Sequence, residues 1–275
     1  ISPRGAELQS LRRGDEELLW QPQAGVWHQT APWLFPFVGR LRGGGYRHHG
    51  RWFEMPLHGF AAHSDFEIVA EYPDAAELRL RDSEATRAHY PFGFELRIGY
   101  RLHAQGLDIR LAVHNPGDET LAFGLGGHPG FALAGDLQDW QLVFEQAEAD
   151  TLWRLQPDPP PWGLRAAAPE PMAWAAPGRL QLQPQLFERD ALILDPLRSD
   201  WVALHQRERG EQLRVLLGGA AQLGLWARPG AAYVCIEPWW GRDDAADAPE
   251  ELLAKPQLQR LGPGERFARE IGVQG

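Results

Sequence analysis

Apolar and polar residues alternate along much of the chain with the period of two that is typical of half-buried β-strands. Residues 94–101 and 107–114 alternate in this way, and the short polar turn between them predicts a β-hairpin. Similar short runs, separated by Gly, Pro and Asp turns, lie at 66–71, 77–81, 140–144, 180–183, 191–194, 201–205, 212–217 and 232–236. The pattern predicts an all-β sandwich or barrel.

Two segments depart from this pattern. Residues 247–254 carry a cap at Asp247, an early proline and acidic residues in the first turn, which predicts one short helix. Residues 156–178 are rich in Pro and Ala. Because strand patterns of the same kind lie on both sides, we interpret 156–178 as a surface excursion rather than a linker, and we expect a single domain over 1–275.

Composition narrows the possible partners. The 275 residues are 44% hydrophobic, which supports a sizeable core, and carry a formal charge of −10. This charge argues against nucleic acid or an anionic membrane as the partner. No apolar run approaches the ~20 residues that cross a bilayer, so the cytoplasm is the expected compartment. Nothing in the sequence predicts the oligomeric state.

The cysteine, lysine and tryptophan residues indicate which reaction mechanisms and ligands the chain could support. Cys235 is the single cysteine, so the chain has no intrachain disulfide, and its apolar neighbours predict a buried small side chain. Lys255 is the single lysine; we expect it at the surface of a leucine-rich segment, which argues against a Schiff-base mechanism. The 12 tryptophans could include flat platforms that stack on sugar rings.

His128 and Glu237 are the strongest candidates for proton transfer. Each precedes a proline, which disfavours helical backbone, so we expect each at a strand end or turn. Two tryptophans and an apolar strand surround Glu237, and desolvation there would raise its pKa toward the range of a useful base. The structural alternatives are a satisfied core histidine and a buried carboxylate paired with an arginine.

Arg40 and His58 also lie in apolar runs. Arg40 could form a structural ion pair or bind ligand oxygens, and His58 could be a core histidine or a site residue. His48, His49 and His63 match no metal-ligand spacing, and we expect His48 and His49 to be solvated in a turn. We therefore predict no metal site, and the chain lacks a Gly-rich phosphate loop.

Five segments together resemble the aldose 1-epimerase (mutarotase) family in order and spacing: 5–8, 35–41, 58–61, 127–131 and 237–239. The resemblance implies a large antiparallel β-sandwich, the supersandwich of mutarotase-like proteins, with a concave sugar-binding face. The chain has Gly-Arg-Leu at 39–41 and His-Gly-Phe at 58–60, where galactose mutarotases carry Asn-Arg and His-Gly-Gly. This difference leaves the sugar open.

The resemblance also implies roles for individual residues. Glu237 would be the base that removes the anomeric hydroxyl proton, and His128 the acid that protonates the ring oxygen. Arg40 and His58 would orient the sugar, and Asp190 is the candidate for the aspartate that binds sugar hydroxyls. The reaction requires no cofactor, and the expected partner is a small free aldohexose.

Two alternatives remain at this point. A hexose-6-phosphate 1-epimerase should gather basic residues, and such relatives commonly have arginine after His-Gly-Phe-Ala; here Ala62 and His63 follow, although Arg40 and Arg42 leave this reading open. A non-catalytic sugar-binding protein on the same fold would not need a matched acid and base.

Overall fold

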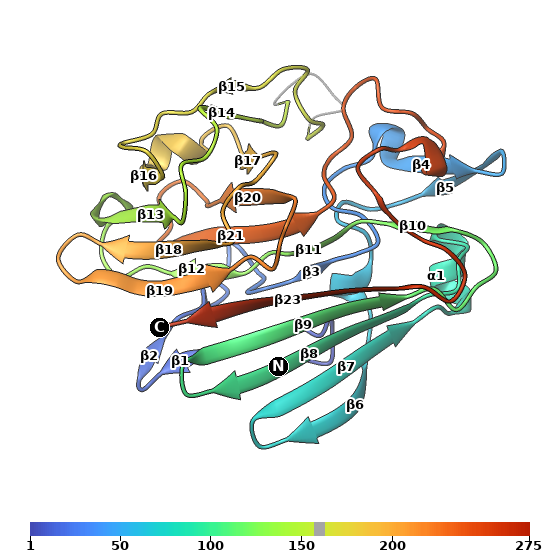
Figure 1. Cartoon of the computed structure of the whole chain (residues 1–275), viewed down its shortest axis with the longest axis horizontal. Helices are drawn as coiled ribbons and strands as arrows, with labels where there is room; N and C mark the ends of the chain where they lie inside the picture. Colours follow the sequence, from blue (N-terminus) through green and yellow to red (C-terminus); the bar gives the residue numbers. More distant parts are fainter. Residues whose placement is uncertain (157–162) are drawn as a thin grey trace.

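The computed structural model describes residues 1–156 and 163–275, in which β-strands are the main secondary structure (Figure 1). Within these residues the strands form two large antiparallel sheets. The nine-stranded sheet has the order β16 (Arg179–Gln181), β13 (Trp140–Phe144), β18 (Trp201–Gln206), β19 (Gly210–Leu216), β23 (Arg266–Gln274), β9 (Gly106–His114), β8 (Glu95–His103), β7 (Ala75–Arg81) and β6 (Glu67–Tyr72).

The six-stranded sheet of the described chain carries the candidate site. Its order is β17 (Leu192–Leu194), β20 (Gln222–Trp226), β21 (Tyr233–Trp240), β11 (Leu125–Gly127) and β3 (Trp33–Leu34), and β12 (Gly130–Ala132) also pairs with β21. Two-stranded pairs are formed by β1 (Arg12–Arg13) with β2 (Glu16–Glu17), β4 (Gly45–His48) with β5 (Arg51–Glu54), β10 (Leu121–Phe123) with β22 (Gln259–Leu261), and β14 (Thr151–Leu152) with β15 (Glu170–Pro171).

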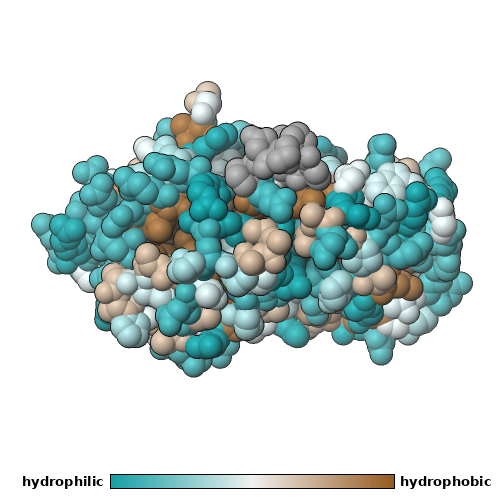
Figure 2. Space-filling model, turned by 90° about the horizontal axis from the view of Figure 1, so that it is seen from above, coloured by the Kyte–Doolittle hydropathy of each residue, from teal (hydrophilic) through white to brown (hydrophobic). Residues whose placement is uncertain are grey.

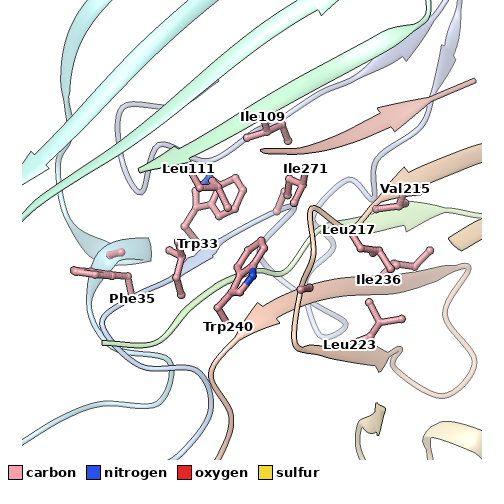
Figure 3. Close-up of a cluster of buried hydrophobic side chains, with 14 of the residues drawn as sticks. Trp33, Phe35, Ile109, Leu111, Val215, Leu217, Leu223, Ile236, Trp240 and Ile271 are labelled. Carbon is pink, nitrogen blue, oxygen red and sulfur yellow. The ribbon is translucent and has the colours of Figure 1, made fainter. Parts of the chain in front are cut away.

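The two large sheets enclose the main hydrophobic core. Ile109 and Ile271 come from the nine-stranded sheet, Ile236 and Trp240 come from the six-stranded sheet, and all four belong to one buried cluster (Figure 3). The structure therefore confirms the predicted all-β fold, a large antiparallel β-sandwich. No helix in the described part of the chain is long and apolar enough to cross a membrane.

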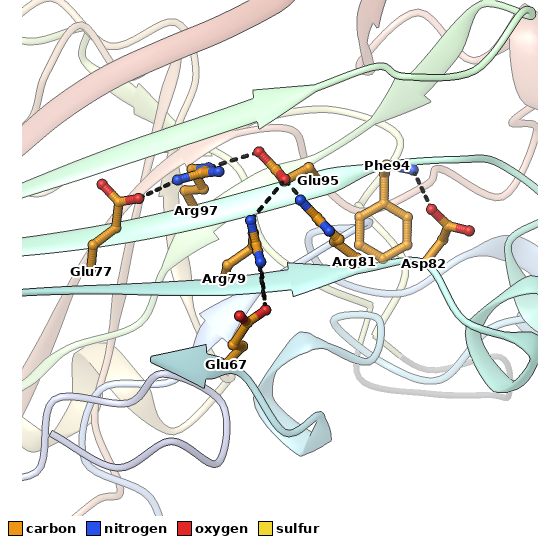
Figure 4. A network of polar contacts seen from close by, with 8 residues as sticks. All are labelled: Glu67, Glu77, Arg79, Arg81, Asp82, Phe94, Glu95 and Arg97. Atoms are coloured by element: carbon orange, nitrogen blue, oxygen red, sulfur yellow. Dashed lines mark hydrogen bonds and ion pairs between the residues drawn. The ribbon is translucent and has the colours of Figure 1, made fainter. Parts of the chain in front are cut away.

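Side chains along β8 point alternately to the buried face and to the outer face of the nine-stranded sheet. Leu96 and Ile98 are fully buried in the core, whereas Glu95 and Arg97 belong to an ion-pair network with arginines of β7 (Figure 4). Hydrogen bonds from Arg97 and Arg81 lower the pKa of Glu95 to about 2, against the opposing effect of burial. The face of the molecule seen in Figure 2 is mainly hydrophilic.

The predicted hairpin at 94–114 is confirmed: β8 pairs with β9 from Glu95–His114 to His103–Gly106. The other predicted strands are also present, most with shifts of one or two residues at their ends, and the strand predicted at 232–236 extends to Trp240. Sequence patterning missed several elements, namely the helix α1 (Glu84–His89), the strands β1, β2, β3, β4, β5, β10, β11, β12, β14, β15, β20, β22 and β23, and the 3₁₀ turns η1 (Arg42–Gly44), η2 (Ala61–His63), η3 (Leu137–Asp139) and η4 (Pro184–Phe187).

The helix predicted at 247–254 is wrong. That segment contains just the 3₁₀ turn η5 (Leu252–Ala254). Its carbonyl groups are engaged elsewhere: the amide of Arg47 donates to Glu250 O at 2.8 Å, and Lys255 Nζ donates to Pro249 O at 2.8 Å. These contacts take the acceptors that an α-helix would need.

The expected surface position of Lys255 is also wrong. Its side chain is fully buried and forms an ion pair with Asp244, which is equally inaccessible. Gln257 donates to the other oxygen of this carboxylate at 2.7 Å. The pair is therefore a fixed part of the interior next to the segment that carries Arg40.

Part of the predicted excursion at 156–178 falls on 157–162, which lie outside the described residues. On either side of that part, Leu155 and Gly163 line the cavity described below. Strands from both sides of the excursion join the same sheet, because β13 pairs with β16 and with β18.

Candidate active site

A gap between two short strands brings His128 and Glu237 together. β21 pairs with β12 through Tyr233–Cys235 and with β11 through Trp239 and Trp240. His128 lies between β11 and β12, opposite the part of β21 that holds Glu237. The two side chains meet there, with His128 Nε2 3.3 Å from Glu237 Oε2.

The expectation of a strand end holds for His128 and is wrong for Glu237, which lies in the middle of β21. Pro238 is tolerated in this central strand because it follows the last residues that pair with β12 and precedes those that pair with β11. The missing amide of Pro238 thus falls where the neighbouring strand is interrupted.

The glycines around His128 make room for tryptophan rings. A Cβ on Gly130 would lie 2.6 Å from the ring of Trp27, and one on Gly126 would lie 2.6 Å from the ring of Trp239. Trp27 in turn packs against the imidazole of His128, with ring centroids 5.1 Å apart. The Gly-rich segment therefore serves close packing of aromatic side chains against the proton-transfer pair.

Burial sets the charge state of this pair. Desolvation lowers the pKa of His128 to about 3, and the nearby His58 acts in the same direction. Desolvation raises the pKa of Glu237 well above its usual value, and the charges of Asp190 and Asp243 add to this effect. Burial therefore favours the neutral forms of both groups, which leaves one titratable proton on the pair.

A backbone contact fixes the orientation of His58. The amide of Gly39 donates to His58 Nδ1 at 3.0 Å, so the neutral ring carries its proton on Nε2. Burial lowers the pKa of His58 to about 4, and Arg40 adds to the shift. The ring stands edge-on to that of His128, with centroids 5.9 Å apart. His58 can therefore act as a neutral hydrogen-bond donor beside the pair.

Two consecutive carboxylates hold the backbone that carries Arg40. Asp243 Oδ1 accepts from the amide of Arg40 at 2.7 Å, and Asp244 Oδ2 accepts from the amide of Arg42 at 2.9 Å. The amide of Asp244 donates back to Arg40 O at 2.9 Å. The buried Lys255 compensates the charge of Asp244. Burial raises the pKa of Asp243 to about 7.

All five residues predicted for the site line one cavity of about 500 Å³. Asp190 lies at its exposed rim with a left-handed backbone (φ 66°), and its Oδ1 accepts from the amide of Ala191 at 2.9 Å. A second cavity of about 520 Å³, between the N-terminal segment and β6–β8, has no histidine among its described lining residues. The residues predicted for the site are therefore concentrated in the first cavity.

Sequence reasoning missed Asp243 and the individual tryptophans of the cavity, Trp27, Trp226 and Trp239. The Asp-Asp doublet six residues after Glu237 was the available signal for Asp243. Its contact partner Arg40 lies 203 positions away in the sequence, so the burial of this carboxylate was not visible locally.

Two groups of side chains in the described residues could hold a metal ion. One is His128, Cys235 and Glu237, and the other is His48, His49 and Glu119; in each group the ligand atoms lie within 4.8 Å of one another. As predicted, Cys235 is buried, and burial raises the pKa of its thiol. A metal in the first group would occupy the His128 and Glu237 atoms that are predicted to transfer protons.

Comparison with known proteins agrees with this architecture. The family model described as aldose 1-epimerase matches residues 1–173. The chain is 28% identical over 271 residues to the chromosomal protein LacX of Lactococcus lactis, covering 94% of this chain and 90% of that protein.

Two solved structures are similar over the whole chain. A galactose mutarotase related enzyme from Lactobacillus acidophilus is 34% identical, with a TM-score of 0.90, and 92% of it is covered. A galactose mutarotase-like protein from Lactobacillus casei is 26% identical, with a TM-score of 0.91, and 95% of it is covered. From the family match and these similarities, the chain belongs to the aldose 1-epimerase family.

Proposed function

We propose that this protein is an aldose 1-epimerase that interconverts the α and β anomers of a free aldohexose. The observation that supports this most directly is the 3.3 Å separation of His128 Nε2 and Glu237 Oε2 on the wall of the cavity. The ring oxygen and the anomeric hydroxyl of an aldose are bonded to the same carbon. An acid and a base that lie side by side can therefore serve both oxygens.

In the proposed reaction the carboxylate of Glu237 removes the proton of the anomeric hydroxyl while the imidazolium of His128 protonates the ring oxygen. The bond between C1 and the ring oxygen breaks, and the open-chain aldehyde forms. Rotation about C1–C2 followed by the reverse proton transfers closes the other anomer, so no proton is gained or lost overall.

The cycle starts with one titratable proton shared between His128 and Glu237. Burial favours this protonation state, because it favours the neutral forms of both groups. Burial raises the pKa of Glu237 and lowers that of His128, which favours the proton on Glu237 over His128. Transfer between the two atoms gives the imidazolium and carboxylate forms that ring opening uses. Microscopic reversibility makes the opposite assignment of acid and base the return half of the same cycle.

The other cavity residues would bind and orient the sugar. Nε2 of His58 is a donor for a sugar oxygen, and Arg40 and Asp190 supply a charged donor and a charged acceptor. The rings of Trp27, Trp226 and Trp239 provide apolar surface for the faces of the pyranose. A cavity of about 500 Å³ lies within the ~300–1,000 Å³ range of small-molecule sites.

The charges of the cavity favour a free sugar over a sugar phosphate. Among its described lining residues, Arg40 is the one arginine, against the carboxyl groups of Asp190, Glu237 and Asp243. Ala62, at the position where phosphosugar relatives commonly carry arginine, also lines this cavity. A phosphate dianion would therefore find one arginine beside three carboxyl groups, without the cluster of basic residues that phosphate binding favours.

The test is to follow the approach to anomeric equilibrium by polarimetry or NMR exchange, starting from fresh α-D-glucose, α-D-galactose and the corresponding 6-phosphates. We expect acceleration with at least one free aldohexose. Faster reaction with the phosphates alone would support the hexose-6-phosphate 1-epimerase, and binding of free aldoses without acceleration would support a non-catalytic sugar-binding protein.

A further inference from the structure

We propose that His48, His49 and Glu119 form a zinc-binding site at the tip of the β4–β5 hairpin, apart from the sugar cavity. His48 Nε2 lies 3.2 Å and His49 Nε2 lies 3.0 Å from the same Glu119 oxygen, Oε2. None of these three residues lines the cavity that holds the proton-transfer pair. The inference is independent of the proposed epimerase activity.

The backbone at His49 is left-handed, and this conformation serves the arrangement. His48 pairs with Arg51, so His49 and Gly50 are the two central residues of the hairpin turn, with φ values of 50° and 76°. Such turns strongly favour Asn-Gly, because both central residues must adopt left-handed backbone. A histidine here is uncommon, and unusual backbone of this kind is concentrated at functional positions.

The turn places two consecutive imidazoles on the same side. Neighbouring side chains of a strand point to opposite faces, yet the rings of His48 and His49 have centroids 4.1 Å apart. The left-handed conformation of His49 breaks the alternation. Both rings therefore direct their Nε2 atoms to one point, at which the carboxylate of Glu119 arrives from another part of the chain.

The side chain of His48 and the backbone that carries Glu119 are held in place before any metal binds. The side chain of His48 is 8% exposed and packs on Phe92, with ring centroids 4.7 Å apart. The buried Asn115 donates to Glu119 O at 2.8 Å and to Leu261 O at 2.9 Å, which fixes the backbone of the loop that carries Glu119. Such prior ordering reduces the entropy lost on binding.

The ligand types and spacing suit zinc. Zinc binds imidazole nitrogen and carboxylate oxygen at about 2.0–2.2 Å, so tetrahedral ligands stand ~3.3 Å apart. The nitrogen-to-oxygen distances of 3.0 and 3.2 Å are close to that value. His49 and Glu119 are more than half exposed, and a cavity of about 350 Å³ lies beside Glu119. Water can therefore complete the coordination.

The experiment is a titration of chelator-stripped protein with ZnCl₂, followed by calorimetry and by the change in melting temperature. The diagnostic variant is His49→Asn, because Asn-Gly suits this turn and the variant should fold normally. We expect it to weaken zinc binding at least tenfold, ~1.4 kcal/mol, and to abolish the rise in melting temperature that zinc causes in the wild type. Glu119→Gln should also weaken binding.

Two controls separate this site from others. His205→Asn removes another surface histidine that pairs with a glutamate, His205 Nε2 lying 3.5 Å from Glu211 Oε2, and should bind zinc as the wild type does. Cys235→Ala alters the second metal-capable group and should also retain binding. The proposal is overturned if the wild type binds no zinc below ~100 μM, if His49→Asn binds as tightly as the wild type, or if Cys235→Ala alone loses binding.

Discussion

His128 and Glu237 face each other at the gap between β11 and β12, where β21 has no paired strand on that side. His128 Nε2 and Glu237 Oε2 lie 3.3 Å apart. The sheet itself creates this meeting point: β11 ends at Gly127, β12 begins at Gly130, and the two residues between them are His128 and Pro129. The proposed acid is thereby fixed by strand pairing on both sides. The proposed base is fixed in the middle of a strand.

Replacement of Glu237 by Gln should abolish turnover while leaving sugar affinity within about tenfold, ~1.4 kcal/mol. The amide keeps the shape of the carboxyl but cannot accept the anomeric proton, so we expect a loss of at least ~10²-fold in the rate of mutarotation. Polarimetry measures the rate and calorimetry the affinity.

The matched control is Glu211→Gln, which alters a glutamate paired with a histidine on β18–β19, outside the cavity. Near-normal mutarotation by Glu237→Gln would remove Glu237 from the role of base.

The ionised carboxylate of Asp243 should lower the free energy of unfolding at and above neutral pH. Burial raises its pKa to about 7 in the folded state from its usual value of 3.8. Between these values the folded state binds more protons than the unfolded state, so the destabilisation begins as pH rises above about 4 and is complete above about 7. Asp243→Asn should therefore raise the free energy of unfolding at pH 8 by roughly 1–3 kcal/mol.

Urea denaturation at pH 8 and at pH 4 checks this expectation, because the advantage of Asp243→Asn should shrink at the lower pH. An advantage that is equal at both pH values would show that the carboxyl does not titrate as proposed.

Gly224→Ala should disturb the floor of the cavity. Gly224 pairs with Glu237 across β20 and β21, and an added Cβ would lie 2.4 Å from the ring of Trp239. The ring must move or the strands must separate, so we expect a loss of ~1–3 kcal/mol in the free energy of unfolding, together with weaker sugar binding.

Gly99→Ala is the control for this substitution, since Gly99 also lies inside a paired strand and its added Cβ would meet the nearest atom at 3.7 Å. It should be nearly neutral. Equal effects of the two substitutions would contradict a specific clash with Trp239.

Lys255→Met should be strongly destabilising, because it leaves the carboxylate of Asp244 buried without its cation. We expect a loss of ~3–5 kcal/mol in the free energy of unfolding. Arg4→Ala breaks an exposed ion pair with Asp65 and should cost no more than about 1 kcal/mol. Thermal or urea denaturation compares the two, and similar small effects would mean that the buried pair is not required.

The fold was largely predictable because the strands carry their pattern locally. Residues 94–114 include both strands and the turn of the β8–β9 hairpin. Their alternating pattern predicts the hairpin without reference to distant residues. The middle position of Glu237 was not predictable, since Pro238 argues against a central strand unless the neighbouring strand is known to be interrupted.

Residues whose setting depends on distant partners were predicted poorly. The burial of Lys255 depends on Asp244, and the helix expected at 247–254 fails because Arg47 takes the carbonyl of Glu250. His48 was expected to be solvated but is 7% exposed. The carboxylate that joins it to His49 comes 70 positions after His49, beyond any local ligand motif.

The burial of Lys255 has a consequence for the durability of the protein. Ring opening, in the proposed reaction, releases an aldehyde, and reducing sugars slowly glycate proteins by condensing with lysine side chains. The single lysine of this chain is inaccessible and ion-paired, and the surface cations are arginines and histidines. The folded protein therefore offers no lysine side chain on which the open-chain form of its proposed substrate could begin that damage.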